Sequence, residues 1–247
     1  MRSSYIMFKT ELKLSLRGLD MLIFALCMPV VVMILMGAVF GTKEAFPGAG
    51  YSFVQQSFGA VSVIAVAAGG VMGLPLVLSN YREKKILKRF QVTPVSPVRI
   101  LVIQVLIYAL YALVSLFLVY GVAVLFLDFV FLGRWPQFLA MYLLVMVAIF
   151  SMGILVGGLA PNEKMAGVYA SLLYFPMLIF SGATLPYEVM PKILQGFADL
   201  LPLTQGIKLL KASSLGLPLA DVIGPLLSIS ILGILCTGIA VRYFKWV

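Results

Sequence analysis

The chain has 247 residues, of which 62% are hydrophobic and 11% charged, and its formal net charge at pH 7 is +9. Soluble domains carry about 25% charged residues, so this composition excludes a water-soluble globular fold and indicates an integral membrane protein. Basic loops on the cytoplasmic side explain the positive charge without a nucleic-acid partner.

The first 19 residues predict an amphipathic helix that lies in the cytoplasmic membrane interface. Basic side chains beside an apolar stripe suit such a helix, because they extend from the interface into water. The alternative is a basic flank to the first span, without a docked helix. The stripe and its basic neighbours are Tyr5, Phe8, Leu12, Leu16 and Leu19, with Lys9, Lys13 and Arg17.

Six uncharged runs follow, each longer than the ~18 residues that indicate a membrane helix. The fold expected is therefore an all-α polytopic membrane protein that forms a single domain over residues 1–247. Glycines and a proline late in the second run predict that this span tilts, kinks or ends early. These residues are Gly69, Gly70, Gly73 and Pro75. The spans are placed at about 21–41, 51–79, 99–126, 137–159, 165–183 and 221–241.

The distribution of basic residues predicts the orientation. With the N-terminus inside, most of them fall in inner segments, so both termini are expected in the cytoplasm. The cell is expected to be bacterial or archaeal. The inner ones are Arg2, Lys9, Lys13, Arg17, Arg82, Lys84, Lys85, Lys88, Arg89, Arg99, Lys164, Arg242 and Lys245, and the outer ones are Lys43, Arg134, Lys192, Lys208 and Lys211.

Residues 81–99 form the one long, densely charged segment in the interior of the chain. In a helix, Glu83, Ile86, Leu87 and Phe90 would share one face, and the prolines from Pro94 onward would end it. A plain positive-inside loop explains the basic residues but not this apolar stripe. The segment therefore predicts a helix that docks into another protein.

The outer segment 181–220 is mildly apolar and contains two helical patterns too short to span a membrane. They predict short re-entrant helices that dip into the outer leaflet or cover it. The first stripe is Ile193, Leu194, Phe197 and Leu200, and the second begins with Ile207, Leu209 and Leu210.

Catalytic and cofactor chemistry is not indicated anywhere in the sequence. There is no histidine, Cys27 and Cys236 lie inside apolar runs, and no GxxxxGK[ST] phosphate loop occurs. We therefore expect no catalytic residue, no metal and no cofactor in this chain. Energy for uphill transport would have to come from a partner.

Polar residues form a stripe on the third span at i, i+4, i+7 and i+11: Gln104, Tyr108, Tyr111 and Ser115. They suit a path for an amphiphilic substrate, and they suit equally well hydrogen bonds between helices. GxxxG spacings permit close helix packing, at Gly37/Gly41, Gly69/Gly73 and Gly153/Gly157.

Two segments together resemble a known family. The first resembles the loop after the second span of ABC-2 type transporter permeases, and the second resembles their outer loop before the last span. Both occur in the expected order and position, so the resemblance covers essentially the whole chain. The residues that carry it are Arg82-Glu83-Lys84, Leu87-Lys88-Arg89-Phe90 and Val92-Thr93-Pro94, then Ser181-Gly182, Leu185-Pro186, Glu188, Met190-Pro191, Leu194 and Leu201-Pro202-Leu203-Thr204.

The resemblance implies a permease subunit that pairs with a second copy or a sister permease. It implies separate ATP-binding cassette subunits, which bind ATP and Mg²⁺ and hydrolyse the nucleotide. Lys85 departs from the glycine that many relatives have there, which favours a more continuous helix. The residues implied to couple to the ATPase are Arg82, Glu83, Ile86, Leu87 and Phe90, and those implied at the outer gate are Pro186, Glu188, Pro191 and Pro202.

The function expected is outward export of a lipophilic or amphiphilic substrate, such as a drug, antibiotic, peptide or lipid. The alternative is a secondary carrier or channel that works alone, although no acidic or basic residue lies in the interior of a span, where such carriers normally keep an ionisable group. A membrane-embedded lipid-modifying enzyme is a further alternative, and it would need a catalytic acid such as Glu188 or Asp199.

Overall fold

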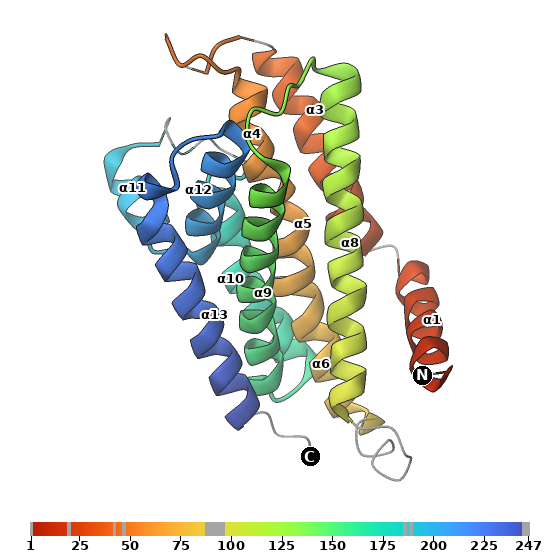
Figure 1. The fold of residues 1–247 in the computed structure, drawn as a ribbon. Coiled ribbons are helices and arrows are strands. Elements are labelled where there is room, and N and C mark those ends of the chain that lie inside the picture. The colour runs from red at the N-terminus through yellow and green to blue at the C-terminus, as the bar shows by residue number, and fades with distance from the viewer. Residues whose placement is uncertain are drawn as a thin grey trace.

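The computed structural model describes residues 2–18, 21–41, 43–45, 48–86, 97–184, 187 and 190–243. These residues form a bundle of helices, with no strand beyond one isolated bridge in the described part (Figure 1). The elements are α1 (Arg2–Arg17), η1 (Leu22–Cys27), α3 (Met28–Phe40), α4 (Phe53–Ser62), α5 (Ile64–Ala67), η2 (Ala68–Gly73), α6 (Leu74–Glu83), α8 (Pro97–Phe126), α9 (Trp135–Leu159), α10 (Glu163–Phe180), α11 (Lys192–Ala198), α12 (Pro202–Leu215), η4 (Leu219–Val222) and α13 (Ile223–Tyr243).

Within the described residues, five helical stretches are long and apolar enough to cross a membrane. The fifth predicted span, 165–183, corresponds to α10, which begins with Glu163 and Lys164 and contains Pro176. It is not one of the five, so a crossing by α10 stays a prediction. The five are Leu22–Phe40, Phe53–Glu83, Val98–Phe126, Trp135–Leu159 and Ala220–Ala240.

The helices run between two ends of the bundle (Figure 1). At one end, which we call the α1 end, lie α1, the C-terminal ends of α6 and α13, the start of α8 and the turn between α9 and α10. At the other, the α12 end, lie α11, α12 and the connections from α3 to α4 and from α8 to α9. The chain segments that meet at each end are therefore far apart in the sequence.

The stretch from α4 to α6 forms the centre of the bundle, and 83% of its apolar 18-residue segment is buried. It is interrupted by the π-helical segment η2, which ends two residues before Pro75. Proline lacks an N–H and clashes with the carbonyl of residue i−4, and a π-helical turn accommodates this. The same pairing occurs where η1 precedes Pro29. The helix continues to Glu83 instead of ending early, and the predicted tilt or kink stays a prediction.

Glycines on α9 allow its backbone to pack directly against the backbone of this central stretch. A Cβ atom on Gly153 would lie 1.7 Å from the Gly70 carbonyl oxygen, and one on Gly157 would lie 2.9 Å from Pro75 Cα. The close packing predicted from the Gly153/Gly157 spacing is therefore confirmed.

Both short patterns in the outer segment form helices, α11 and α12. Ile207 and Leu210 of α12 are buried against α4 and α9. In the first stripe, Ile193 and Leu200 are 88% and 79% exposed, whereas the Phe197 ring contacts Phe180 of α10. The re-entrant position of these helices in a membrane stays a prediction.

The predicted N-terminal helix forms as α1 and packs beside α8 (Figure 1). Phe8 and Leu12 contact the bundle, whereas Tyr5 and Leu16 are exposed and Leu19 lies outside the described residues. The interfacial location of α1 stays a prediction.

Candidate functional site

The charged segment after the second span does not form one continuous helix. Helix α6 ends at Glu83, and Lys85 adopts a left-handed conformation with φ of +54°. Glu83 and Ile86 therefore do not share one helical face, and the expectation that Lys85 makes the helix more continuous is wrong. Leu87 and Phe90 lie outside the described residues.

Lys85 occupies a conformation that suits glycine, because its Cβ atom crowds the backbone there. We expect Lys85→Gly to raise the free energy of unfolding by about 1 kcal/mol, since relief of this strain exceeds the entropic cost of glycine. Thermal denaturation of the detergent-purified protein measures the change. A Lys84→Gly variant is the control, because Lys84 is not left-handed, and it should not be stabilised. Equal stability of Lys85→Gly and wild type would contradict the assignment of strain.

Arg82 links the end of α6 to the end of α9. Its Nη1 donates to the carbonyl oxygens of Gly158 at 2.6 Å, Ala160 at 3.1 Å and Gly157 at 3.3 Å. The last carbonyls of a helix have no partner within the helix, and a cation there also complements the helix dipole. Arg82 therefore caps the C-terminus of α9.

Glu83 makes the corresponding contact with the start of α10. Its carboxylate accepts a hydrogen bond from the backbone N–H of Glu163 at 2.9 Å. One turn earlier, the Asn80 amide donates to the Glu163 carboxylate. Arg82 and Glu83 thus hold the α9–α10 turn from both sides, and we call this contact region the α6 junction.

A cavity of about 500 Å³ lies beside the α6 junction. Hydrogen bonds between side chains of α1, α6 and α8 form its polar wall. Tyr81 donates to Glu11 at 2.6 Å, and Gln104 donates to the same carboxylate oxygen at 2.9 Å. Apolar side chains such as Phe24 and Met72 form much of the remaining wall.

The four polar residues of the predicted α8 stripe are all buried, but their contacts differ. Gln104 and Tyr108 line this cavity, which fits the path hypothesis. Gln104 also bonds to α1, as does Tyr111, whose hydroxyl donates to Ser15 at 3.0 Å. These contacts fit the alternative of hydrogen bonds between helices. The Ser115 hydroxyl has no hydrogen-bond partner among the described residues.

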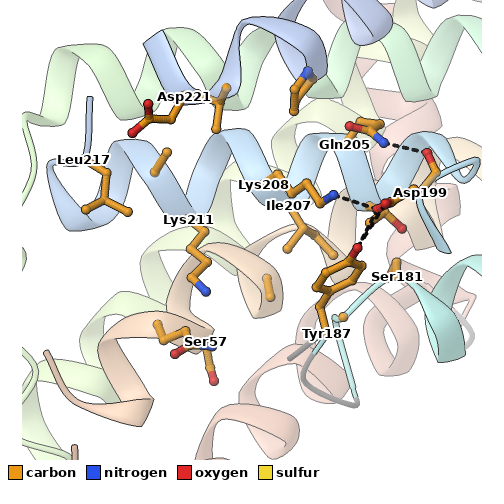
Figure 2. A pocket seen from close by; sticks show the side chains of 17 residues that line it. Ser57, Ser181, Tyr187, Asp199, Gln205, Ile207, Lys208, Lys211, Leu217 and Asp221 are labelled. Carbon is orange, nitrogen blue, oxygen red and sulfur yellow. Dashed lines mark hydrogen bonds and ion pairs between the residues drawn. The ribbon is translucent and has the colours of Figure 1, made fainter. Parts of the chain in front are cut away.

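At the α12 end, Asp199 is the centre of a polar network that lines a second cavity of about 510 Å³ (Figure 2). Its carboxylate accepts from Tyr187 at 2.9 Å and pairs with the Lys208 ammonium at 2.6 Å. The Gln205 amide donates to its backbone carbonyl at 2.5 Å. Burial and, to a smaller extent, the hydrogen bond to Asp199 raise the pKa of Tyr187. The phenol is therefore protonated and donates at neutral pH. We call this set the Asp199 network.

The Asp199 network holds the connection after α10 against α12. We expect Asp199→Asn to change the unfolding free energy by about 0–1 kcal/mol, because the ion pair is partly exposed. Hydrogen exchange of backbone amides in 190–208 should accelerate, since Lys208 loses its charged partner. Asp128→Asn, in the α8–α9 connection at the same end, is the matched control. Unchanged exchange in both variants would contradict a holding role for Asp199.

The four predicted gate residues are only partly described. Pro191 precedes α11, and Pro202 occupies the first turn of α12, where its missing N–H costs nothing. Pro186 and Glu188 lie outside the described residues. Within the described part, no group of three or more potential metal ligands of the His, Cys, Asp and Glu types comes together.

Sequence reasoning missed Glu11, Tyr187, Asp199 and Lys208 as members of polar networks. Glu11 contacts Gln104 across 93 positions of sequence, and no local pattern signals such a pair. The Asp199–Lys208 pair lies nine positions apart with Pro202 between, so helical spacing rules do not reveal it.

Comparison with known proteins agrees with this architecture. The family model described as ABC-2 type transporter matches residues 2–215. A Nodulation protein J of Neorhizobium galegae is 35% identical over 98 residues, which are 40% of this chain and 35% of that protein. The protein of the same name from Rhizobium leguminosarum bv. viciae is 38% identical over 76 residues, 31% of this chain and 29% of that protein. The chain thus matches about a third of the length of these curated relatives. Because the family model covers most of its residues, the chain belongs to the ABC-2 type transporter family.

Proposed function

We propose that this chain is the transmembrane permease subunit of an ABC exporter, powered by ATP that a separate nucleotide-binding subunit hydrolyses. In this proposal α10 is the sixth span, and both termini and the α6 junction face the cytoplasm. The positive-inside distribution supports this orientation, because the segments at the α1 end carry most of the basic residues. The arrangement of the α1 end, with the C-terminal end of α13 beside it, agrees with this orientation (Figure 1).

The α6 junction is the observation that carries the proposal. Arg82 and Glu83 contact the α9–α10 turn directly, so a force on the segment that follows them reaches α9 and α10. In the proposed mechanism, ATP-driven closure of the nucleotide-binding subunits moves Ile86, Leu87 and Phe90. Arg82 and Glu83 then carry this motion to the α9–α10 turn, as positioning residues between the ATPase and the spans.

The cavity beside the α6 junction is proposed as the inner end of the transport path. Gln104 and Tyr108 supply polar groups there, and Phe24 and Met72 supply apolar surface, which suits an amphiphilic cargo. Tyr111 and Ser115 continue the stripe along α8. At the α12 end, the Asp199 network and the segment with Pro186, Glu188, Pro191 and Pro202 are proposed to close the outer exit.

Co-purification with an ATP-binding cassette ATPase encoded next to this chain tests the proposal. We expect a stable complex that contains two permease chains and two ATPase chains, measured by mass spectrometry of the intact assembly. Its ATPase activity should change when the permease is present in lipid vesicles. A chain that recruits no ATPase and supports flux driven by an ion gradient would overturn the proposal in favour of a stand-alone carrier.

A further inference from the structure

The cavity beside the α6 junction has an imbalance of charge that a path for any amphiphile does not require. Two carboxylates line it, those of Glu11 on α1 and Glu163 at the start of α10, and no lysine or arginine is among its described lining residues. The basic residues that flank them in the sequence, Lys9, Lys13 and Lys164, are exposed and do not line the cavity. The wall is therefore negatively charged at neutral pH.

Neither carboxylate has a cationic partner within the described part of the chain. Glu11 Oε2 accepts from two neutral donors, the Tyr81 hydroxyl at 2.6 Å and the Gln104 amide at 2.9 Å. Glu163 accepts from the Asn80 amide, which is also neutral. No described group donates to the second oxygen of either carboxylate. Partial burial of a carboxylate without a counter-charge costs free energy, which a cation in the cavity would offset.

The Tyr108 hydroxyl is an independent sign of a missing ligand. Tyr108 is 3% exposed and lines the same cavity. Its hydroxyl forms no hydrogen bond with any residue that the structure describes. The Ser115 hydroxyl also lacks a partner, but it has no accessible surface, whereas the Tyr108 hydroxyl keeps some. A phenol oxygen accepts hydrogen bonds, so a donor bound in the cavity would satisfy it.

The wall offers hydrogen-bond acceptors to a ligand more than donors. Tyr81 and Gln104 already donate to Glu11, and the Gln104 amide also donates to the Tyr81 oxygen at 3.1 Å. A carboxylate only accepts, so the ligand must supply the N–H or O–H groups. The two carboxylates would repel an anionic ligand. The polar wall therefore selects a cation that carries hydrogen-bond donors.

The apolar wall indicates the rest of the ligand. The volume of about 500 Å³ lies in the range of sites for small organic molecules. Leu14 and Phe24 line the cavity and are 57% and 46% exposed, and Met72 and Val77 line it from the central stretch. Phe24 belongs to the candidate span Leu22–Phe40, whose exposed side chains contact lipid in a membrane. The cavity therefore suits an apolar body that enters from the lipid side.

We propose that this cavity binds an amphiphilic organic cation. Its ammonium group donates to Glu11 and to the Tyr108 oxygen, Glu163 adds a second negative charge, and its apolar body lies against Leu14 and Phe24. As a statement about the exported cargo, this rests on the proposed function. As a binding site, it requires neither export nor an ATPase.

Fluorescence binding to the full chain, in phosphatidylcholine nanodiscs without an ATPase, tests the site. The probes are dansylcadaverine, its N-acetyl derivative and dansyl-6-aminohexanoic acid. They share the fluorophore and have similar chains, but end in an ammonium, a neutral amide and a carboxylate. After subtraction of binding to empty nanodiscs, dansylcadaverine should bind at least about tenfold more tightly than either other probe, as expected for hydrogen bonds to a charged group.

Glu11→Gln should weaken dansylcadaverine binding about tenfold, because it removes the charge but keeps an acceptor for Tyr81 and Gln104. Binding of the N-acetyl probe should stay unchanged. Tyr108→Phe should weaken dansylcadaverine binding about threefold, the effect of one neutral hydrogen bond, and should fold normally, because the lost hydroxyl bonds to no described residue.

Two matched controls should keep the wild-type affinity. Glu44→Gln removes a carboxylate at the α12 end, where Glu44 accepts from the Gly48 N–H. Tyr174→Phe removes another buried hydroxyl without a described partner, which lies outside this cavity. A loss of affinity in these controls equal to that in Glu11→Gln and Tyr108→Phe would overturn the assignment to this cavity.

The site and the proposed function can fail separately. Equal affinity for the ammonium and N-acetyl probes, tighter binding of the carboxylate probe, or undiminished dansylcadaverine binding in Glu11→Gln would each overturn the cation site, even if an ATPase assembles with the chain. If the expected pattern is found but the chain recruits no ATPase, the site stands and export is the part that fails.

Discussion

Arg82→Gln is expected to lower the free energy of unfolding by about 2–3 kcal/mol, the value of hydrogen bonds from a charged donor to partly buried acceptors. Three carbonyl oxygens at the end of α9 share the Arg82 guanidinium, and glutamine has neither its reach nor its charge. Thermal denaturation in detergent measures this loss. If the α6 junction transmits force, the variant should also lose most of its transport when the complex is reconstituted.

Lys84→Gln is the matched control for Arg82→Gln. Lys84 is exposed and also basic, and it lies two positions after Arg82 in the sequence. Its replacement should leave stability and transport near wild type, which separates a loss of charge from a loss of the α9 cap. Similar losses in both variants would show that net charge at the α1 end, rather than the α6 junction, is responsible.

Gly153→Ala is expected to destabilise the bundle by about 3 kcal/mol, at the upper end of the cost of overpacking. The added methyl would lie 1.7 Å from the Gly70 carbonyl oxygen, so two helix backbones would have to separate. Backbone atoms cannot move aside as a flexible side chain can. The measurement is the unfolding temperature together with the yield of monodisperse protein.

Gly121→Ala and Gly167→Ala test whether this effect is specific to position 153. A Cβ atom at either position would meet no atom within 4 Å, and alanine is the better helix former. Both variants should be at least as stable as wild type. A Gly153→Ala protein with their stability would contradict the close packing of α9 against η2.

The membrane class and the helices could be predicted because hydropathy and length decide them. The charges of residues 81–99 singled out a segment whose first residues, Arg82 and Glu83, contact the α9–α10 turn. The prediction that Glu83 and Ile86 share one helical face was wrong because helical periodicity describes only an isolated helix. In the structure, Arg82 and Glu83 contact the α9–α10 turn, and the chain turns at Lys85.

The fifth span shows a second limit of sequence reasoning. The stretch 165–183 is uncharged, but α10 starts earlier, at Glu163, whose backbone N–H bonds to Glu83 and whose carboxylate accepts from Asn80. The N-cap residue Asn162, whose side chain accepts from the Met165 N–H, and these tertiary contacts together set the helix boundary, and hydropathy reports neither. The same holds for Glu11, which is joined to Tyr81 and Gln104 from helices remote in sequence.

The most direct test of the central claim compares ATP hydrolysis and substrate export in vesicles that contain this chain and the ATP-binding cassette ATPase proposed as its partner. Glu83→Gln removes the charge that accepts the Glu163 N–H, and Lys84→Gln is the control. We expect Glu83→Gln to keep the complex assembled but to lower export per ATP by about tenfold, the equivalent of about 1.4 kcal/mol of lost coupling. Lys84→Gln should export as wild type. Unchanged export per ATP in Glu83→Gln would contradict the role of the α6 junction in linking the ATPase to α9 and α10.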